Sequence, residues 1–274
     1  MKKILVTGSE GYIGSHLCAF LRSFGYDVHT LDIQGTPDYK IDVSNQFQIP
    51  RNTQKLKFDV VIHLAALVRV NESVDKPWLY YDTNVNGTFN VLNGFGCESF
   101  IFASTGTASN PINPYAMSKR CAEDIVKEHC EDHNRHYTMF RFYNVTGTNG
   151  SPATNPDGLF YNLVKAQNEG RFNLFGTDYN TPDGTAIRDY IHVMEVCQAI
   201  HKAVKAPTGG IENLGTGVGH TVKEMINQFK KSNNCDFVVN AMPRREGDLE
   251  KLVLDNPSNY YVKMYTFEGL MKNE

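Results

Sequence analysis

The sequence predicts an α/β protein with a Rossmann-type, doubly wound parallel sheet and a smaller, interleaved α/β lobe toward the C-terminus. Two observations predict this class. In the first half, short apolar runs alternate with segments of helical spacing, which is typical of a parallel sheet covered on both faces. After about Gly147 the elements become shorter and turn residues more frequent. We therefore expect a first domain over 1–147, joined by returning segments near 185–220, and a second domain over 148–274.

The first half contains apolar runs of the length of buried strands. They lie at 4–6, 28–31, 58–64, 100–103 and 137–142. Helical spacing predicts a helix directly after the glycines at 8–14, and further helices over 77–91 and 114–128. The last two begin with proline, which suits a first helical turn because the N–H groups there have no helical partner.

The second half is predicted to be less regular. A turn-rich loop covers 150–158, and a helix near 163–168 and a strand near 172–175 follow it. A helix over 193–204 leads to a strand at 210–215 that we expect to return to the main sheet. Thr221 is the expected N-cap of a helix running to Phe229, because its hydroxyl can accept from the first N–H groups.

Composition and charge narrow the class of protein. The 274 residues are 41% hydrophobic and 21% charged with a net charge of −3, and no long basic block occurs. A nucleic-acid or membrane-surface partner is therefore not expected. The apolar run that follows Met1-Lys2-Lys3 ends at Thr7, too short for a signal peptide. No segment approaches the roughly 20 apolar residues that span a bilayer.

The cysteines and histidines suggest neither disulfides nor a metal. Six cysteines are scattered without a C-x-x-C pair, so we expect free thiols and a cytoplasmic protein. His63 and His192 stand in apolar runs without a spaced set of carboxylates or cysteines. We therefore interpret both as structural histidines and expect no metal.

A glycine-rich turn at Gly8, Gly11 and Gly14 connects the first strand to the first helix. Glycines in such a turn let the backbone approach a ligand closely, and the N–H groups at the helix start favour a phosphate. Asp32 ends the second strand, where a carboxylate can accept both ribose hydroxyls of an adenosine and repel a 2′-phosphate. The chain is therefore predicted to bind a dinucleotide, and NAD rather than NADP.

Tyr115 and Lys119 lie four residues apart in a predicted helix and therefore on one face of it. An ammonium one turn from a phenol is expected to lower the phenol's pKa, so that it can exchange a proton with a sugar hydroxyl. A surface Tyr/Lys pair is the simpler interpretation of such a spacing alone. The nucleotide-binding pattern upstream favours the interpretation that Tyr115 and Lys119 are catalytic.

These motifs and several later ones resemble the extended short-chain dehydrogenase/reductase family, closest to its UDP-glucose 4-epimerase branch. The resemblance covers nearly the whole chain, and its most specific run is Arg188-Asp189-Tyr190-Ile191-His192-Val193. The other matching segments are Thr7–His16, Asn84–Thr88, Tyr115–Lys119, Arg141–Gly147, Asn213–Gly217 and Pro243–Asp248.

The resemblance implies an NAD-dependent nucleotide-sugar 4-epimerase that oxidises a UDP-hexose transiently at C4 and returns hydride to the opposite face. Thr105 would bind the reacting oxygen beside Tyr115 and Lys119, and the implied substrate is held by arginines at its diphosphate. The implied cofactor residues are Gly8, Gly11, Tyr12, Ile13, Gly14, Asp32, Asp42, Val43, Leu64, Ala65, Ala66, Asn84, Ser104, Tyr115, Lys119 and Tyr143. The implied substrate residues are Asn144, Asn162, Leu163, Phe175, Arg188, Tyr190, Arg245 and Asp248.

Some positions depart from the family pattern. Only nine residues, Gly106 to Pro114, separate Thr105 from Tyr115, fewer than is usual in the family. Gly106-Thr107 offers no carboxylate, which disfavours a dehydratase. The residues Val68 and Leu252 do not determine which sugars the chain accepts.

The alternatives are a nucleotide-sugar reductase or decarboxylase on the same fold, and a non-catalytic nucleotide-binding protein. Members of the family usually dimerise through two helices of each subunit. The resemblance therefore implies a homodimer through 77–91 and 114–128.

Overall fold

The computed structural model describes residues 1–49, 56–149, 158–245 and 247–273. The chain divides into two compact units. Unit 1 comprises Met1–Arg141 and Ala199–Glu212, and unit 2 comprises Phe142–Gln198 and Asn213–Glu274. Most of the predicted loop at 150–158 lies outside the described residues. None of the described helices is long and apolar enough to cross a membrane.

Unit 1 is built around a sheet that, within the described residues, has seven strands in the order β10-β6-β5-β4-β1-β2-β3. Neighbouring strands are parallel from β5 through β4, β1 and β2 to β3. The strands are β1 (Lys3–Thr7), β2 (Asp27–Asp32), β3 (Tyr39–Lys40), β4 (Lys57–His63), β5 (Gly96–Thr105), β6 (His136–Phe142) and β10 (Gly210–Leu214). The predicted α/β class and the return of the strand near 210 to the main sheet are both confirmed.

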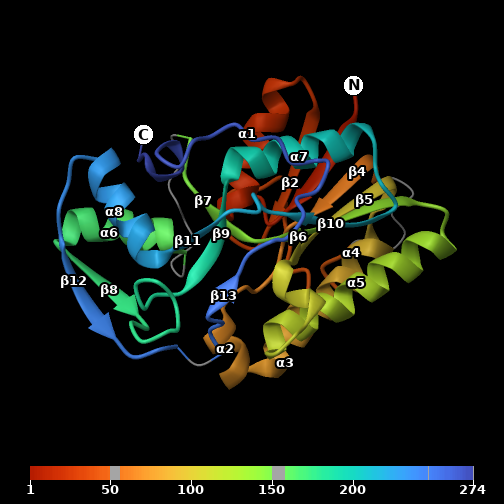
Figure 1. Ribbon diagram of the computed structural model, residues 1–274. Coiled ribbons are helices and arrows are strands. Elements are labelled where there is room, and N and C mark those ends of the chain that lie inside the picture. Colours follow the sequence, from red (N-terminus) through yellow and green to blue (C-terminus); the bar gives the residue numbers. More distant parts are fainter. Residues whose placement is uncertain (50–55, 150–157, 246, 274) are drawn as a thin grey trace. The chain divides into compact units, whose positions relative to one another are not determined.

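Helices cover both faces of this sheet (Figure 1). α1 (Tyr12–Ser23) and the second half of α7 (Val193–Lys205) lie on one face, and α4 (Gly87–Gly94) and α5 (Pro114–Asp132) on the other. The predicted helix over 77–91 is confirmed as a continuous helical run, but it is not α-helical throughout. It consists of α3 (Pro77–Tyr81), a π-helical turn η2 (Asp82–Asn86) and α4, preceded by α2 (Val70–Asp75). A π-helical turn often marks a functional site.

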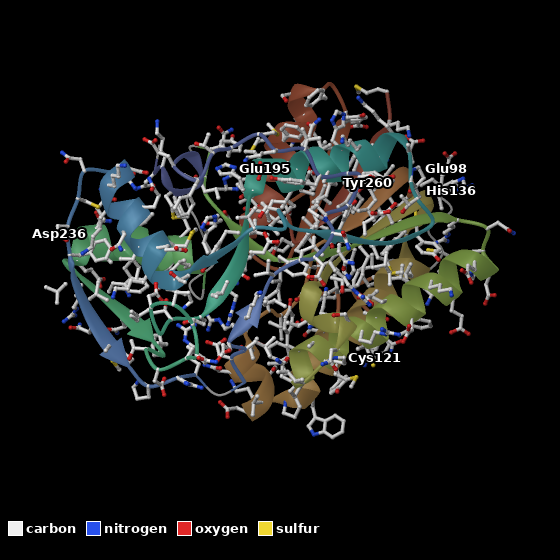
Figure 2. The ribbon with its side chains drawn as sticks, viewed as in Figure 1. Glu98, Cys121, His136, Glu195, Asp236 and Tyr260 are labelled. Atoms are coloured by element: carbon white, nitrogen blue, oxygen red, sulfur yellow. The ribbon has the colours of Figure 1, made fainter. Side chains whose placement is uncertain are left out.

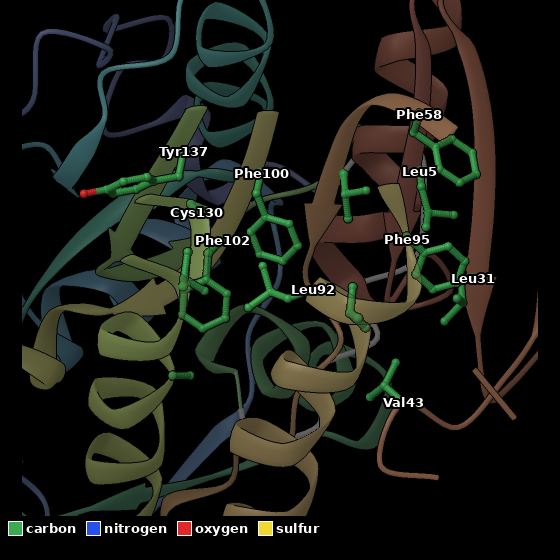
Figure 3. Packing of buried hydrophobic residues seen from close by; sticks show 14 of the residues in the cluster. Leu5, Leu31, Val43, Phe58, Leu92, Phe95, Phe100, Phe102, Cys130 and Tyr137 are labelled. Carbon is green, nitrogen blue, oxygen red and sulfur yellow. The ribbon is translucent and has the colours of Figure 1, made fainter. Parts of the chain in front are cut away.

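One hydrophobic core of unit 1 lies between the sheet and the helices on the side of α4 and α5 (Figure 3). Alternate residues of β5, such as Phe100 and Phe102, point into it, as the two-residue period of a strand requires. They meet Leu92 of α4 and Cys130 of α5. This packing fixes α5, which carries Tyr115 and Lys119, against the strand that ends at Thr105.

In its described residues, unit 2 contains two smaller sheets. β9 (Ile187–His192) pairs with β7 (Asn144–Thr146), β11 (Gly219–Thr221) and β13 (Lys251–Leu252), and β8 (Arg171–Phe175) pairs in parallel with β12 (Val238–Met242). α6 (Leu159–Glu169) and α8 (Val222–Ser232) pack over a second core. The predicted cap is confirmed, because Thr221 Oγ1 accepts from Glu224 N at 3.0 Å. Two 3₁₀-helical turns, η3 (Gly106–Ser109) and η4 (Gly269–Met271), complete the described elements.

Candidate active site

The glycine-rich turn places the start of α1 beside the carboxyl ends of β1 and β4. Gly8 has φ +70°, and a Cβ there would lie 2.7 Å from the amide nitrogen of Ala65. A Cβ at Gly14 would lie 2.0 Å from the carbonyl oxygen of Gly8. Only glycine fits both positions, so the turn packs closely enough for a ligand to approach the backbone. Among the described residues no side chain caps α1, and an uncapped helix start can bind a phosphate.

Asp32 stands at the end of β2, next to this turn. Its carboxylate accepts from the backbone N–H of Glu10 at 2.9 Å and of Gln34 at 3.0 Å. A carboxylate has about four acceptor positions, so two backbone donors leave capacity for the hydroxyls of a ribose. The close-packed glycine turn, the uncapped helix start and this acceptor together fit an adenine dinucleotide, with Asp32 favouring NAD over NADP.

His63 connects the segments around this turn through a chain of hydrogen bonds. Thr88 Oγ1 donates to Asn84 O at 2.6 Å, so it accepts from Nε2 of His63 at 3.1 Å. Thr7 Oγ1 accepts from Ala65 N at 3.2 Å and therefore donates to Nδ1 of His63 at 2.7 Å. The imidazole is thus neutral with its hydrogen on Nε2, and burial lowers its pKa to about 3.

Asn84, a predicted cofactor residue, is buried in the π-helical turn rather than open to the groove. Its Oδ1 accepts from Leu67 N at 2.8 Å, and its Nδ2 donates to Leu67 O at 3.0 Å and to Ser118 Oγ at 2.9 Å. Every polar atom of this amide is therefore used within the protein. Asn84 ties the segment after Ala65 to α5 at Ser118, the residue before Lys119.

Tyr115, Lys119 and Thr105 come together where α5 follows the end of β5. Asn113 caps α5 by accepting from Ala116 N at 2.9 Å, and the hydroxyl of Thr105 lies close enough to Tyr115 to lower the pKa of its phenol. Thr105 also caps the η3 turn through Thr107 N at 3.4 Å. The nine-residue connection therefore holds the hydroxyl of Thr105 and the phenol of Tyr115 against each other.

The expected lowering of the Tyr115 pKa by Lys119 is wrong for this structure. Burial raises the pKa of Tyr115 to about 12, opposed by the hydrogen bond with Thr105. Burial also lowers the pKa of Lys119 to about 7, while Glu123 raises it. The ammonium of Lys119 lies 4.3 Å from the centroid of the Phe102 ring. The physical reason is desolvation, which disfavours the charged form of both groups more than their spacing favours it.

Glu123 and Arg141 continue the group of side chains formed by Thr105, Tyr115 and Lys119. Neither of them was identified as a site residue from the sequence. Arg141 donates from Nε at 2.8 Å to one carboxylate oxygen of Glu123 and from a terminal nitrogen at 2.7 Å to the other. Ser104 Oγ donates to the first oxygen at 2.5 Å, which leaves this predicted cofactor residue buried and engaged. The sequence did contain a signal for Glu123, because this residue is four positions after Lys119 and therefore lies on the same helix face.

Unit 2 holds a cavity of about 620 Å³ between α6, β8 and β9. Arg188, from β9, approaches Asp248 at 3.5 Å, and Arg245 lies 4.1 Å from the centroid of the Phe175 ring. A planar ring beside two guanidinium groups suits a nucleotide, since guanidinium groups bind paired phosphate oxygens. All predicted substrate residues except Leu163 line the cavity: Asn144, Asn162, Phe175, Arg188, Tyr190, Arg245 and Asp248.

Other predicted residues lie elsewhere. The side chain of Leu163 is buried in the core of unit 2, and that of Val43 in the core of unit 1. Asp42 accepts from Ser44 N at 2.9 Å, and Tyr143 N donates to Leu214 O at 3.1 Å. Tyr12 and Ile13 form the first turn of α1, and Leu64 and Ala66 flank Ala65 after β4.

Asp189 lies inside the most specific sequence run, 188–193, but it was given no role from the sequence. It is completely buried and does not line the cavity of unit 2 described above. One carboxylate oxygen accepts from Thr216 N at 2.8 Å and Thr216 Oγ1 at 2.6 Å, and the other from Gly217 N at 2.9 Å and Leu254 N at 3.3 Å. This carboxylate joins the segments around β9 and thereby orients Arg188 and Tyr190 on either side of it.

The fold and the cofactor turn define a Rossmann-type, NAD-dependent protein. The pattern of the NAD dependent epimerase/dehydratase family matches residues 4–219. The chain therefore belongs to the NAD-dependent epimerase/dehydratase family. Its sequence is 32% identical to UDP-glucose 4-epimerase of Rhizobium leguminosarum bv. trifolii, over 92% of this chain and 89% of the relative. It is also 32% identical to UDP-glucose 4-epimerase of Homo sapiens, over 90% and 87% of the two chains.

Solved structures agree with this assignment. The UDP-glucose 4-epimerase of Thermus thermophilus in complex with NAD has a TM-score of 0.85 at 27% identity, covering 98% of this chain and 96% of that one. The enzyme of Bifidobacterium longum in complex with NAD⁺ and UDP has a TM-score of 0.85 at 29% identity, with coverages of 98% and 95%. The similarity extends over both units of the chain.

Proposed function

We propose that the chain is an NAD-dependent nucleotide-sugar 4-epimerase that acts on a UDP-hexose. The observation that carries this proposal is the hydrogen-bonded pair of Tyr115 and Thr105 beside the buried Lys119. Such a set moves a proton to or from a hydroxyl group. The cavity with Arg188 and Arg245 supports a nucleotide diphosphate as the part of the substrate that is held.

In this proposal the ionised phenolate form of Tyr115 takes the proton of the sugar C4 hydroxyl, and Thr105 hydrogen-bonds the same oxygen. When bound, NAD supplies reversible hydride acceptance. Lys119 holds the cofactor ribose, and Asp32 its adenosine ribose. Arg188 and Arg245 keep the diphosphate anchored while the 4-keto sugar turns its other face. Phe175 borders the base, and Asp248 accepts from the adjoining ribose. Tyr115 then returns the proton.

The raised pKa of Tyr115 makes Thr105 important to the proposed proton transfer. At neutral pH a phenol with a pKa of about 12 is protonated, and its hydrogen bond with Thr105 favours the ionised form. Loss of either hydroxyl should therefore reduce turnover without releasing the cofactor. Removing one general acid–base group typically costs on the order of 10²- to 10⁴-fold in rate.

The test is incubation of the purified chain with a panel of UDP-hexoses and chromatography of the products. Interconversion of the C4 epimers without net formation of free NADH supports the proposal. Net change in free NADH indicates the reductase or decarboxylase instead. Binding of NAD without turnover of any sugar indicates a non-catalytic protein. Tyr115→Phe should retain NAD and lose turnover, and unchanged turnover would refute the assignment of Tyr115.

We also propose a homodimer that acts in the cytoplasm. Exposed apolar side chains on α3, α4 and α5 support the dimer: Trp78 is 82% exposed, Phe89 50% and Met117 39%. All six cysteines are free, which suits a reducing compartment. Light scattering on the wild type and on Trp78→Glu tests the assembly, and fractionation of cells that produce the chain tests the location.

A further inference from the structure

Two consecutive arginines in unit 2 lie over two aromatic rings. The guanidinium group of Arg245 is 4.1 Å from the centroid of the Phe175 ring, and that of Arg244 is 4.1 Å from the centroid of the Tyr179 ring. The parallel pairing of β8 with β12 sets Met242 opposite Phe175. The segments that follow these two strands therefore run beside each other. The segment after β8 carries Tyr179, and the segment after β12 carries Arg244 and Arg245.

The two arginines differ in their charge partners. Arg244 donates from Nε to Asp178 Oδ1 at 2.7 Å and from a terminal nitrogen to the carbonyl of Asp178 at 2.5 Å. No described carboxylate lies within ion-pair distance of Arg245, which lines the cavity, whereas Arg244 does not line it. The charge of Arg244 is thus neutralised, and that of Arg245 is available to an anion.

The segment that carries the two rings is itself held in place. Gly176 N donates to Met242 O at 3.0 Å, and Tyr179 N donates to Gly184 O at 3.0 Å. Gly176 has φ +76°, and a Cβ there would lie 2.4 Å from the Tyr179 ring. The ring is 5% exposed, and its hydroxyl has no hydrogen-bond partner among the described residues. The ring rather than the hydroxyl is therefore what Tyr179 contributes.

We propose that Arg244, clamped by Asp178 and Tyr179, is a positioning residue that holds Arg245 over Phe175 to receive the substrate diphosphate. This inference rests on the proposed function, since it assigns the anion to a nucleotide sugar. Arg244 itself does not touch the substrate. It acts by keeping Arg245 in its binding geometry before the ligand arrives, which removes part of the ordering cost of binding.

The experiment compares variants by steady-state kinetics with UDP-galactose and by calorimetric titration with UDP alone. Arg244→Ala should raise KM and the Kd of UDP about fivefold and leave kcat unchanged, consistent with the loss of one cation–π contact and its ion pair. Arg244→Lys should recover part of the loss. Tyr179→Phe should bind UDP like the wild type, whereas Tyr179→Leu should resemble Arg244→Ala.

Unit 2 offers a matched control. Lys230, on α8, pairs with Asp236 at 2.6 Å, donates to Phe237 O at 2.7 Å and lies 4.5 Å from the centroid of the Phe237 ring. Figure 2 labels Asp236, which lies in the segment between α8 and β12. Lys230→Ala removes the same kinds of contact, and neither Lys230 nor Phe237 lines the cavity, so KM and the affinity for UDP should not change.

Three results would overturn the inference. The first is that Arg244→Ala binds UDP with wild-type affinity although Arg245→Ala binds UDP more weakly than the wild type. The second is an equal loss of affinity in Lys230→Ala, which would indicate a general effect on unit 2. The third is unchanged affinity in Arg245→Ala, which would remove the anion anchor itself. If the wild type binds UDP but does not epimerise a sugar, the proposed function fails, and the titrations still decide the role of Arg244.

Discussion

Glu123 and Arg141 form a two-pronged ion pair in the interior of unit 1, one helical turn below Lys119. The carboxylate of Glu123 opposes the effect of burial on the pKa of Lys119. Arg141 in turn compensates Glu123, and Ser104 joins the pair to the residue before Thr105. Glu123, Arg141 and Ser104 thus hold one end of the candidate catalytic group of Thr105, Tyr115 and Lys119.

Removing one partner of this pair should be far more damaging than removing both. Glu123→Ala leaves the buried guanidinium of Arg141 uncompensated and should destabilise the fold by about 3–5 kcal/mol. The double variant Glu123→Leu/Arg141→Met should recover most of that loss. Midpoints of urea unfolding measure the difference. A double variant as unstable as the single one would mean that the charges themselves are needed.

Lys119 should make stability rise with pH above neutrality. Its pKa in the folded chain is lowered to about 7 from 10.5, so between these values the unfolded chain binds more protons. The free energy of unfolding then increases with pH, by about 2 kcal/mol from pH 7 to pH 9 for this one group. Lys119→Met should lack this part of the slope. Lys127→Met, an exposed position on α5, should keep it.

A difference of slope between Lys119→Met and the wild type is the decisive quantity. Unfolding curves at several pH values between 7 and 9 give it directly. Parallel pH dependences for the two proteins would show that the ammonium is not desolvated in the folded chain.

Asp32 should determine the choice of cofactor. Asp32→Asn keeps an acceptor for only one of the N–H groups of Glu10 and Gln34, which bind different carboxylate oxygens, and it removes the charge that repels a 2′-phosphate. We expect NAD to bind about tenfold more weakly and NADP to bind measurably. Asp27→Asn, at the opposite end of β2, is the control and should leave both affinities unchanged. Fluorescence titration with each dinucleotide measures them, and a variant that still excludes NADP contradicts the assignment.

Asp189 should be needed for stability rather than for chemistry. In Asp189→Asn an amide NH₂ replaces one oxygen, so the donors Gly217 N and Leu254 N, or those of Thr216, lose their acceptor in the interior. The expected cost is about 2–4 kcal/mol. Thermal unfolding of this variant should be compared with that of Asp255→Asn, an exposed position. At a temperature where the variant is folded, a large loss of kcat with no loss of stability would refute this view.

Local patterns were sufficient for much of the fold. The strands at 4–6 and 137–142, the helix that contains Cys18–Leu21 and the helix from Pro114 were predictable because apolar period and end signals act over a few residues. The division of 77–91 into α3, a π-helical turn and α4 was not predictable. It depends on where the amide of Asn84 finds its partners, Leu67 and Ser118, which are distant in sequence.

The same distinction applies to the site. The sequence by itself determined the glycine turn, Asp32 and the spacing of Tyr115 and Lys119, because each is a local pattern of residue types. Only the tertiary structure decided which charges these groups experience: that burial raises the pKa of Tyr115, and that Arg141 of β6 reaches Glu123 of α5. Desolvation and long-range pairing depend on everything that surrounds a group in space, and neither is encoded within a short stretch of chain.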